Sequence, residues 1–292
     1  MTIATLIKGH ERDLGGGFVV RRYLPAAVKQ AVGPFIFFDH FGPLDVPLDA
    51  DHDVRPHPHI GLATVTYLFE GAMDHRDSIG SFQRIEPGAI NWMTAGRGIV
   101  HSERTPKDLV GRPHRTHGLQ LWAALPAAHE EDEPNFAHTP AEAIPEFASG
   151  GATVRVLIGS AFGLTSPVKT YSQTLYLDVA LKAGEQIELD GLPAEAAIYP
   201  VSGALAMDGA ELALHTMALL DTAAPQRVTA VGDAQFVVIG GEPLDGHRFM
   251  FWNFVSSRKE RVVQAGEDWE AQRFEPVPGE TERIPLPAKR PA

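Results

Sequence analysis

Two short motifs combine residues that can bind a metal ion. His57-Pro-His59 and His101-Ser-Glu103 each place two potential ligands two positions apart. On a β-strand, residues i and i+2 point to the same face, roughly 6–7 Å apart along the backbone. Two neighbouring strands with these motifs would offer three imidazoles and a carboxylate to one centre. We therefore predict a metal site formed by His57, His59, His101 and Glu103.

The donor set indicates which metals such a site would take. Imidazole with carboxylate suits Fe, Mn, Ni, Cu or Zn better than Ca or Mg, which prefer oxygen ligands. Four ligands on an octahedral metal leave two positions, for a substrate or for substrate and dioxygen. Glu103 could double as a general base if its bond to the metal is labile. A lone His-x-His pair is more often structural, and the second pair is what favours a site. A purely structural metal is disfavoured, because structural sites usually close their coordination shell.

Four weaker candidates are predicted to line the pocket or to support the ligands: His75, Gln120, Trp122 and Phe38. The alternative for His75 is that it is a hydrogen-bonded residue of the core. The same alternative applies to His117. The aromatic side chains are more often core than pocket wall. Pro58 removes one backbone donor from its strand, which places that strand at a sheet edge or barrel mouth.

The composition of the 292-residue chain is that of a globular protein, with 44% hydrophobic and 21% charged residues. The net charge of −12 argues against a surface for nucleic acids or anionic membranes, which both favour clustered Lys and Arg. The chain has no cysteine, which excludes disulfides, thiolate zinc sites and a cysteine nucleophile. No stretch reaches the roughly 18 apolar residues of a membrane span. We expect a soluble, cytoplasmic protein.

Gly and Pro recur in short clusters, which is typical of many short strands joined by turns. One helix is predicted from near Ser257 to Trp269, because Ser257 and Glu260 have capping-box spacing. The segments rich in Val, Ile, Thr, Tyr and Phe are predicted strands: Phe18–Leu24, Phe35–Phe38, Ala63–Phe69, Ser81–Ile85, Gly118–Leu125, Thr153–Ile158, Thr174–Leu181, Ala196–Val201, Met217–Asp221 and Gln235–Ile239.

The chain is predicted to form two domains, 1–125 and 149–292, because residues 126–148 are acidic and rich in Pro and Ala. The acidic run at 130–133 is interpreted as a solvated part of this linker. The last dozen residues contain three prolines and are expected to form an extended tail.

The two halves share a weak internal similarity. Tyr67-Leu-Phe-Glu-Gly-Ala72 has a counterpart 132 positions later in Tyr199-Pro-Val-Ser-Gly-Ala204, with three identities in six residues. Coincidence and a real duplication both fit a match of this length. If the duplication is real, the histidines of the first motif correspond to Leu189 and Gly191, and the second half has kept the scaffold without the ligands.

At these same residues the sequence resembles the pirin family of the cupin superfamily. The likeness is strong from about residue 10 to 125 and looser afterwards, through Gly240-Gly-Glu-Pro243 and the segment Phe249–Val255. The matching stretches of the first half are long and ordered: Pro34–Pro43, Arg55–Gly61, Thr64–Gly71, His75–Ser78, Asn91–Glu103 and Gly118–Trp122.

The resemblance implies an all-β bicupin, with two antiparallel β-barrel domains packed face to face and a few short helices near the C-terminus. It implies that the first domain binds one metal through His57, His59, His101 and Glu103, and that the second lacks ligands. Fe(II) is the metal expected from the family, with Mn, Ni, Cu or Zn as alternatives. A chain that already contains both barrels has little need to dimerise, so we expect a monomer.

Two functions follow from the resemblance. The first is a quercetin 2,3-dioxygenase, in which Glu103 takes the proton of the flavonol 3-hydroxyl and dioxygen cleaves the C ring, releasing carbon monoxide and leaving a phenolic ester. The second is an iron-binding regulatory protein that acts through a protein partner without turnover, since Fe(II) and Fe(III) differ by one buried charge. Direct contact with nucleic acid is not expected for either.

Overall fold

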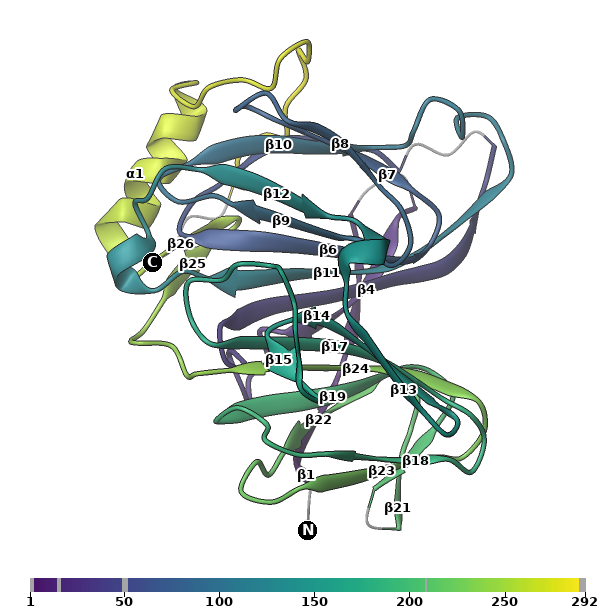
Figure 1. The fold of residues 1–292 in the computed structure, drawn as a ribbon. Coiled ribbons are helices and arrows are strands. Elements are labelled where there is room, and N and C mark those ends of the chain that lie inside the picture. Colours follow the sequence, from purple (N-terminus) through teal and green to yellow (C-terminus); the bar gives the residue numbers. More distant parts are fainter. Residues whose placement is uncertain (1–2, 15–16, 49–51, 208, 289–292) are drawn as a thin grey trace. The chain divides into compact units, whose positions relative to one another are not determined.

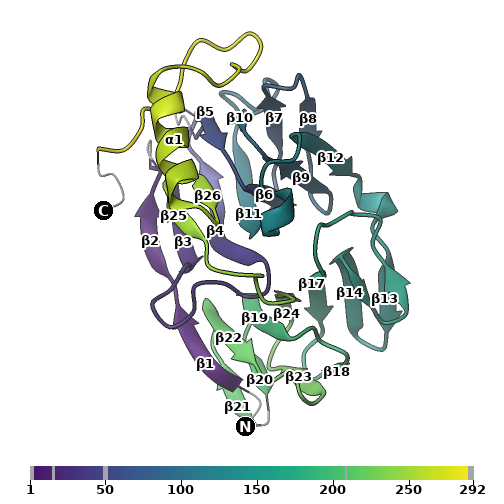
Figure 2. The same cartoon turned by 90° about the vertical axis from the view of Figure 1, so that its left-hand side faces the viewer.

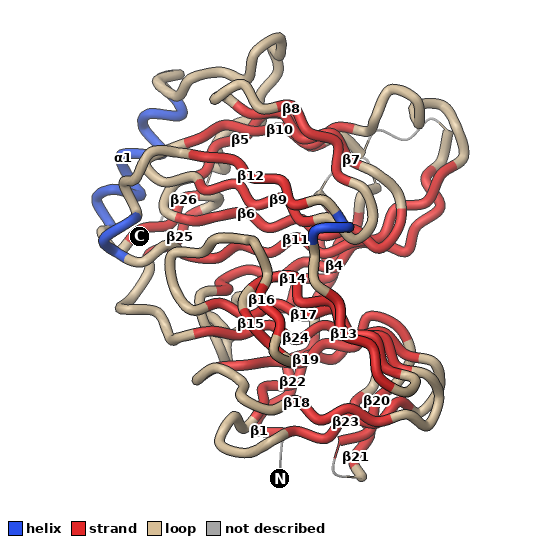
Figure 3. Tube along the Cα trace, in the orientation of Figure 1, coloured by secondary structure: helices blue, strands red, loops and turns tan. Residues whose placement is uncertain are grey.

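The computed structural model describes residues 3–14, 17–48, 52–207 and 209–288 (Figure 1). Strands dominate this part of the chain, and α1 (Lys259–Glu270) is its one helix longer than a single 3-10 turn (Figure 3). Each of the ten predicted strands overlaps a strand of the structure. No helix in these ranges is both long and apolar enough to cross a membrane.

The chain divides into two compact units that are each built from separated segments. The first, which we call the apolar unit, comprises Met1–Glu11, Arg21–Phe38 and Glu142–Leu244. The second, which we call the histidine unit, comprises Arg12–Val20, Asp39–Ala141 and Asp245–Ala292. This division differs from the expected boundary at residues 126–148.

The expected linker contributes structure to both units, which explains the difference. Strand β12 (Asn135–Thr139) pairs with β9 (Ile90–Thr94) in the histidine unit, and β13 (Glu146–Ser149) pairs with β14 (Ala152–Ile158) in the apolar unit. The interpretation of the acidic run as a solvated linker was wrong for Glu130. Its side chain is 3% exposed and forms an ion pair with Arg248.

In the histidine unit, a large and a small antiparallel sheet form the cupin fold. The large sheet has the order β12-β9-β6-β11-β4-β3-β2, of which the last three strands lie only partly in this unit. The small sheet has the order β5-β10-β7-β8. The bounds not yet given are β6 (Leu62–Glu70), β11 (His114–Ala124), β4 (Phe35–Val46), β3 (Val19–Leu24), β2 (His10–Asp13), β5 (Val54–His59), β10 (Ile99–Arg104), β7 (Met73–Asp77) and β8 (Phe82–Ile85).

Helix α1 packs against the hairpin of β25 (Phe249–Phe251) and β26 (Phe254–Ser256), as Figures 1 and 2 show. Its buried side chains, which include Val262 and Trp269, join Val100 of β10 in one apolar cluster. The predicted helix is therefore confirmed, but its predicted cap is wrong. Arg258 is the N-cap and makes no side-chain cap bond, whereas the Ser257 hydroxyl donates to Glu130.

The apolar unit repeats the strand order of the histidine unit. Its large sheet runs β1-β22-β19-β24-β17-β14-β13 and its small sheet β18-β23-β20-β21, so the strands correspond one by one. This equivalence supports the internal duplication. The remaining bounds are β1 (Ile3–Lys8), β22 (Thr216–Leu220), β19 (Glu195–Ser202), β24 (Ala234–Gly241), β17 (Thr174–Leu181), β18 (Gln186–Leu189), β23 (Gln226–Ala230), β20 (Leu205–Met207), β21 (Ala210–Leu212), β15 (Ser160–Ala161), β16 (Leu164–Thr165), and the 3-10 turns Ala127–His129 and Ala141–Ala143.

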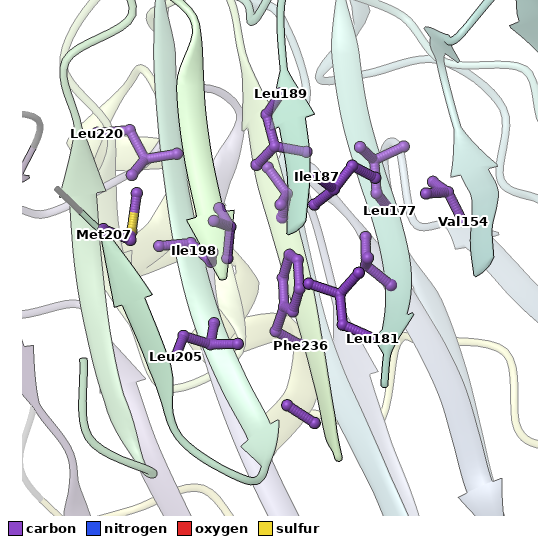
Figure 4. Packing of buried hydrophobic residues seen from close by; sticks show 14 of the residues in the cluster. Val154, Leu177, Leu181, Ile187, Leu189, Ile198, Leu205, Met207, Leu220 and Phe236 are labelled. Carbon is purple, nitrogen blue, oxygen red and sulfur yellow. The ribbon is translucent and has the colours of Figure 1, made fainter. Parts of the chain in front are cut away.

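Hydrophobic side chains from both sheets fill the interior of the apolar unit. Figure 4 shows Phe236 at the centre, surrounded by aliphatic side chains such as Ile198, Leu181 and Leu189. Each such side chain contributes about 1.5–3 kcal/mol when it is fully removed from water. Among the described residues, this packed interior holds no cluster of potential metal ligands.

Gly61 makes the turn from β5 to β6, and its conformation leads to a stability prediction. Its φ is +69°, and a Cβ placed on it would lie 1.9 Å from the carbonyl oxygen of Val255. Gly61→Ala is therefore expected to reduce the free energy of unfolding by about 2–5 kcal/mol, from the backbone conformation and the clash together. Urea denaturation measures this.

Gly111 provides the matched control. Its φ of +67° is nearly the same, but no atom lies within 4 Å of its would-be Cβ. Gly111→Ala should therefore cost only the backbone contribution, about 1–2 kcal/mol. Equal losses for the two variants would contradict the close approach at Gly61.

Candidate metal centre

The small sheet of the histidine unit brings three imidazoles together. Strands β5 and β10 pair so that His57 lies opposite His101, while His59 lies opposite Ile99. One nitrogen from each of the three histidines lies within 4.8 Å of the other two. β5 is an edge strand, as Pro58 predicted. The structure thus assembles three of the four predicted ligands from residues 42 positions apart in sequence.

The environment of these histidines keeps their rings neutral. His57 is 7% exposed, and both His59 and His101 are 1% exposed. Burial lowers the pKa of His57 to about 4, although its Nδ1–H donates to the carbonyl of Arg55. Burial, together with the other histidines, also lowers the pKa of His59 and of His101 well below the ordinary value. Neutral imidazole is the form that binds a metal, so no proton has to be lost first.

The spacing of the nitrogens fits a transition metal. Imidazole nitrogens bind such a metal at about 2.1 Å and, at adjacent corners of an octahedron, lie about 3 Å from each other. His59 Nε2 and His101 Nε2 are 3.1 Å apart. In His57, the bond from Nδ1 to Arg55 leaves Nε2 with a free lone pair. Three converging imidazole nitrogens in a buried setting are a suitable cradle for one cation.

Glu103 stands apart from this cluster. The pairing of β5 with β10 is irregular here, because β5 has one extra residue between Val54 and His57, so Glu103 lies opposite Val54, whereas β10 pairs with β7 in regular register. Its carboxyl group accepts no hydrogen bond from the described residues. The residue keeps some solvent exposure, but protein surrounds the carboxyl group, and this burial raises its pKa to about 7. Its role as fourth ligand stays a prediction.

The corresponding positions of the apolar unit hold no ligand set. Leu189 in β18 corresponds to His57 and lies opposite Gln226, as His57 lies opposite His101. Two residues further along β23, Val228 takes the position of Glu103. Leu189 and Val228 both belong to the packed apolar interior. Of the two equivalent sites, the one in the histidine unit alone has the chemistry to bind a metal.

His75 and Asp77 continue the cluster behind His101. His75 Nδ1 lies 3.4 Å from His101 Nδ1, and His75 Nε2 lies 3.0 Å from Asp77 Oδ2. Burial would raise the pKa of Asp77, but hydrogen bonds from His75 and Ser81 lower it overall. Sequence reasoning missed Asp77. The i, i+2 spacing in His75-Arg-Asp77 was the available signal, since it is the same spacing that identified the ligands.

The other weak candidates have different surroundings. Trp122 packs edge to face on His59, with ring centroids 5.2 Å apart. Gln120, two residues earlier on β11, accepts a hydrogen bond from Thr66 at 2.9 Å. Phe38 belongs to the apolar unit, where its ring packs edge to face on Tyr23 and Tyr199. The structure therefore brings Trp122 to the histidine cluster and gives Phe38 a core role.

The C-terminal segment after α1 covers the opposite face of β10. The carboxylate of Glu280 accepts a hydrogen bond from Ser102 at 2.5 Å and forms an ion pair with Arg104, and its side chain is 5% exposed. Further along, Ile284 N donates to the carbonyl of Pro56 in β5 at 2.8 Å. The even-numbered residues of β10 thus bind this segment, whereas His101 faces the cluster.

Replacing Glu280 by glutamine is expected to reduce the free energy of unfolding by about 3 kcal/mol, the lower end of the cost of losing one partner of a buried ion pair. The loss stays at that end because Arg104 keeps Asp53 as a partner at 3.3 Å. Glu282→Gln is the control, because Glu282 is 57% exposed and lies 3.8 Å from Arg104. Equal effects of the two variants in urea denaturation would show that the buried pair is not stabilising.

Comparisons with known proteins show which family and fold this chain resembles. A family model described as Pirin matches residues 17–123, and one described as Pirin C-terminal cupin domain matches residues 176–275. A pirin-like protein of Caulobacter vibrioides is 43% identical over 98% of this chain and 99% of its own length. Pirin of Homo sapiens is 33% identical, with 89% of each chain covered. The crystal structure of quercetin 2,3-dioxygenase from Acinetobacter baumannii is similar with a TM-score of 0.91 and 32% identity, over 99% of this chain and 96% of that chain.

Proposed function

The chain belongs to the pirin family, and on this basis we propose that it is a metal-dependent dioxygenase that cleaves a flavonol with O2. The observation that carries the proposal is the buried cluster of His57, His59 and His101, whose nitrogens lie within 4.8 Å of one another. The similarity to a structure described as a quercetin 2,3-dioxygenase supports the substrate class.

The three histidines would hold the metal, with Glu103 as the fourth ligand. Fe(II) is the proposed ion, and the donor set also accepts Mn, Ni, Cu or Zn. When bound, the metal would supply Lewis acidity toward the flavonol oxygen and, if redox-active, electrons for reaction with dioxygen. The protein has to supply the remaining parts, which are a base, a buried pocket and a fixed arrangement of the ligands.

Glu103 is the proposed base. Its pKa of about 7, which results from burial, makes it a stronger proton acceptor than an ordinary carboxylate, and about half of the population is ionised at pH 7. It would take the proton of the flavonol 3-hydroxyl onto a carboxylate oxygen. In the overall reaction, both oxygen atoms of O2 enter the products, one ring carbon leaves as carbon monoxide, and a phenolic ester remains.

Trp122 is proposed to form part of the aromatic wall against which a flat flavonol would pack. Its indole contacts the ring of His59, so an aromatic surface adjoins the ligand cluster. Buried aromatic pairs favour edge-to-face or offset stacking, which suits a polycyclic phenol. A hydrophobic wall also excludes water, which would otherwise solvate the anionic substrate.

The test measures quercetin loss, oxygen uptake and carbon monoxide release by protein loaded separately with Fe(II), Mn(II), Ni(II), Cu(II) or Zn(II). We expect one CO released for each O2 consumed with a redox-capable metal, and no turnover with Zn(II), which has no redox chemistry. A fully loaded protein that consumes no oxygen with any of these metals would overturn the dioxygenase proposal and favour the partner-binding function.

A further inference from the structure

A chain of hydrogen-bonded groups leads away from the metal cluster into the protein. It runs from His101 Nδ1 to His75 Nδ1 over 3.4 Å, and from His75 Nε2 to Asp77 Oδ2 over 3.0 Å. We propose that Asp77 and His75 are positioning residues that fix the tautomer and orientation of His101 for metal binding. This inference rests on the proposed function in that His101 is taken to be a metal ligand.

With a neutral His75, the chain has one consistent arrangement of protons. A carboxylate can accept hydrogen bonds but not donate them, so His75 must donate to Asp77 from Nε2. A neutral His75 then has no proton on Nδ1, and this nitrogen accepts from Nδ1–H of His101. His101 is left with an unprotonated Nε2, the atom that faces His59 Nε2 in the cluster.

Both positioning residues are held rigidly. The other carboxylate oxygen of Asp77, Oδ1, accepts from the backbone N–H groups of Ile79 and Ser81, at 3.1 and 2.9 Å. The ring of His75 stacks on Phe136, with centroids 4.3 Å apart and planes inclined by 11°. Asp77 is fully buried, and His75 is 5% exposed. The chain therefore cannot reorient easily when His101 binds a ligand, which is what a support for a metal-binding histidine requires.

His57 reaches the same protonation state by a different route. Its Nδ1–H donates to the backbone carbonyl of Arg55, a group that cannot be changed by substitution and that needs no further support. His101 depends on side chains instead. The proposal can therefore be tested at His101 without disturbing the corresponding bond of His57.

Asp77→Asn is the decisive substitution, because it keeps an oxygen for the two backbone donors and replaces the oxygen that faces His75 by an amide NH2. His75 would then have to accept a hydrogen bond from this amide on Nε2 and carry its own proton on Nδ1. That proton would point at the Nδ1–H of His101, so the hydrogen bond between the two rings would be lost. We expect the affinity for Ni(II), measured by titration calorimetry without substrate, to fall about 10–100-fold. The absorption bands of bound Co(II) should shift as well.

Asp74→Asn is the matched control, since Asp74 is also a buried carboxyl on β7 but lies opposite Arg104 in the pairing of β7 with β10. It should leave the affinity for Ni(II) and the Co(II) bands unchanged. A fall of the same size in this variant would show that any buried charge on β7 affects the site, and would contradict a specific role for Asp77.

A double-mutant cycle separates positioning from general support of the fold. In a His75→Phe background the stack on Phe136 is kept but the chain of hydrogen bonds is broken, so Asp77→Asn should cause no further loss of Ni(II) affinity. If Asp77→Asn costs the same with and without His75, the inference fails while the metal site stands. A wild-type protein that binds neither Ni(II) nor Co(II) would instead overturn the proposed function itself.

Discussion

His101→Ala is expected to abolish the oxygen-dependent loss of quercetin. His101 is central to the cluster, since its ring lies 4.3 Å from the ring of His57 and 4.9 Å from that of His59. Loss of a side chain that hydrogen-bonds a metal-binding residue typically costs about 10–100-fold in metal affinity or activity. Loss of the metal-binding residue itself should therefore cost more than about 100-fold. Turnover and metal content, measured on the same preparation, check this.

The fold must survive for this result to be informative. His101→Gln preserves most of the buried volume and should lose turnover to a similar degree, with little change in the thermal transition. His114→Ala is the control, because His114 Nδ1–H donates to the carbonyl oxygen of Arg112 and the residue is not part of the ligand cluster. Retention of full turnover by a folded His101→Ala protein would exclude this site as the catalytic centre.

Glu103→Gln is expected to reduce kcat about 10²–10⁴-fold while the metal is retained. The amide cannot accept the proton of the flavonol hydroxyl, and loss of a general base typically costs this much. The three histidines remain, so the metal content should fall far less than in His101→Ala. Steady-state kinetics with a measured metal content separates the two roles that we propose for Glu103.

The pH dependence gives a second measure of the same residue. Below its pKa of about 7, Glu103 is protonated and can neither bind a metal nor accept a proton. Metal affinity and kcat/KM should therefore fall as the pH decreases, and level off above the pKa. A bound cation favours the carboxylate, so the inflection in the loaded protein should lie below 7. The imidazole of His57, with a pKa of about 4, does not titrate in this range.

In Glu103→Gln this inflection should disappear. Glu86→Gln serves as the control, because Glu86 is 62% exposed and pairs with Arg84 at the surface of the same unit. It should retain both the rate and the pH profile of the wild type. If Glu103→Gln turns over at the wild-type rate, the carboxylate is not the base, and the proton must leave the substrate by another route.

The ligand cluster could be predicted because it depends on local geometry. The i, i+2 spacing of His57 and His59 on one strand is sufficient to place both side chains on one face. Pro58 correctly placed that strand at a sheet edge. The equivalence of Leu189 with His57 also followed from a short internal match, and the identical strand orders support it.

Glu130 and Ser257 show where local patterns fail. Ser257 has capping-box spacing to Glu260, but Glu130 accepts its hydroxyl hydrogen at 2.9 Å and its backbone N–H at 2.7 Å. A partner 127 positions away in sequence therefore takes the group that the local motif would use. The same long-range contact explains why an acidic run that looks solvated contains a buried carboxylate.

The contacts of the C-terminal segment could not be predicted either, because their partners are also far away in the sequence. Nothing in the residues around Glu280 indicates that its carboxylate binds Arg104, which lies 176 positions earlier. The three prolines of the last dozen residues indicate only the absence of helix and strand. The partner of an extended segment is determined by the surface on which it lies, and that surface exists only once β5 and β10 have paired.

The histidine unit is built from separated segments of the chain, and this affects the order in which the two units can fold during translation. All segments of the apolar unit precede Asp245, whereas the histidine unit needs Asp245–Ala292. Chains grow from the N-terminus at about 5–20 residues per second, and domains generally fold as units. The apolar unit can therefore fold during synthesis before the histidine unit, which must wait until Asp245–Ala292 has been made. Metal-competent protein would accordingly form only after this segment has been made, and a chain that stops before Asp245 would have a folded apolar unit and an incomplete site.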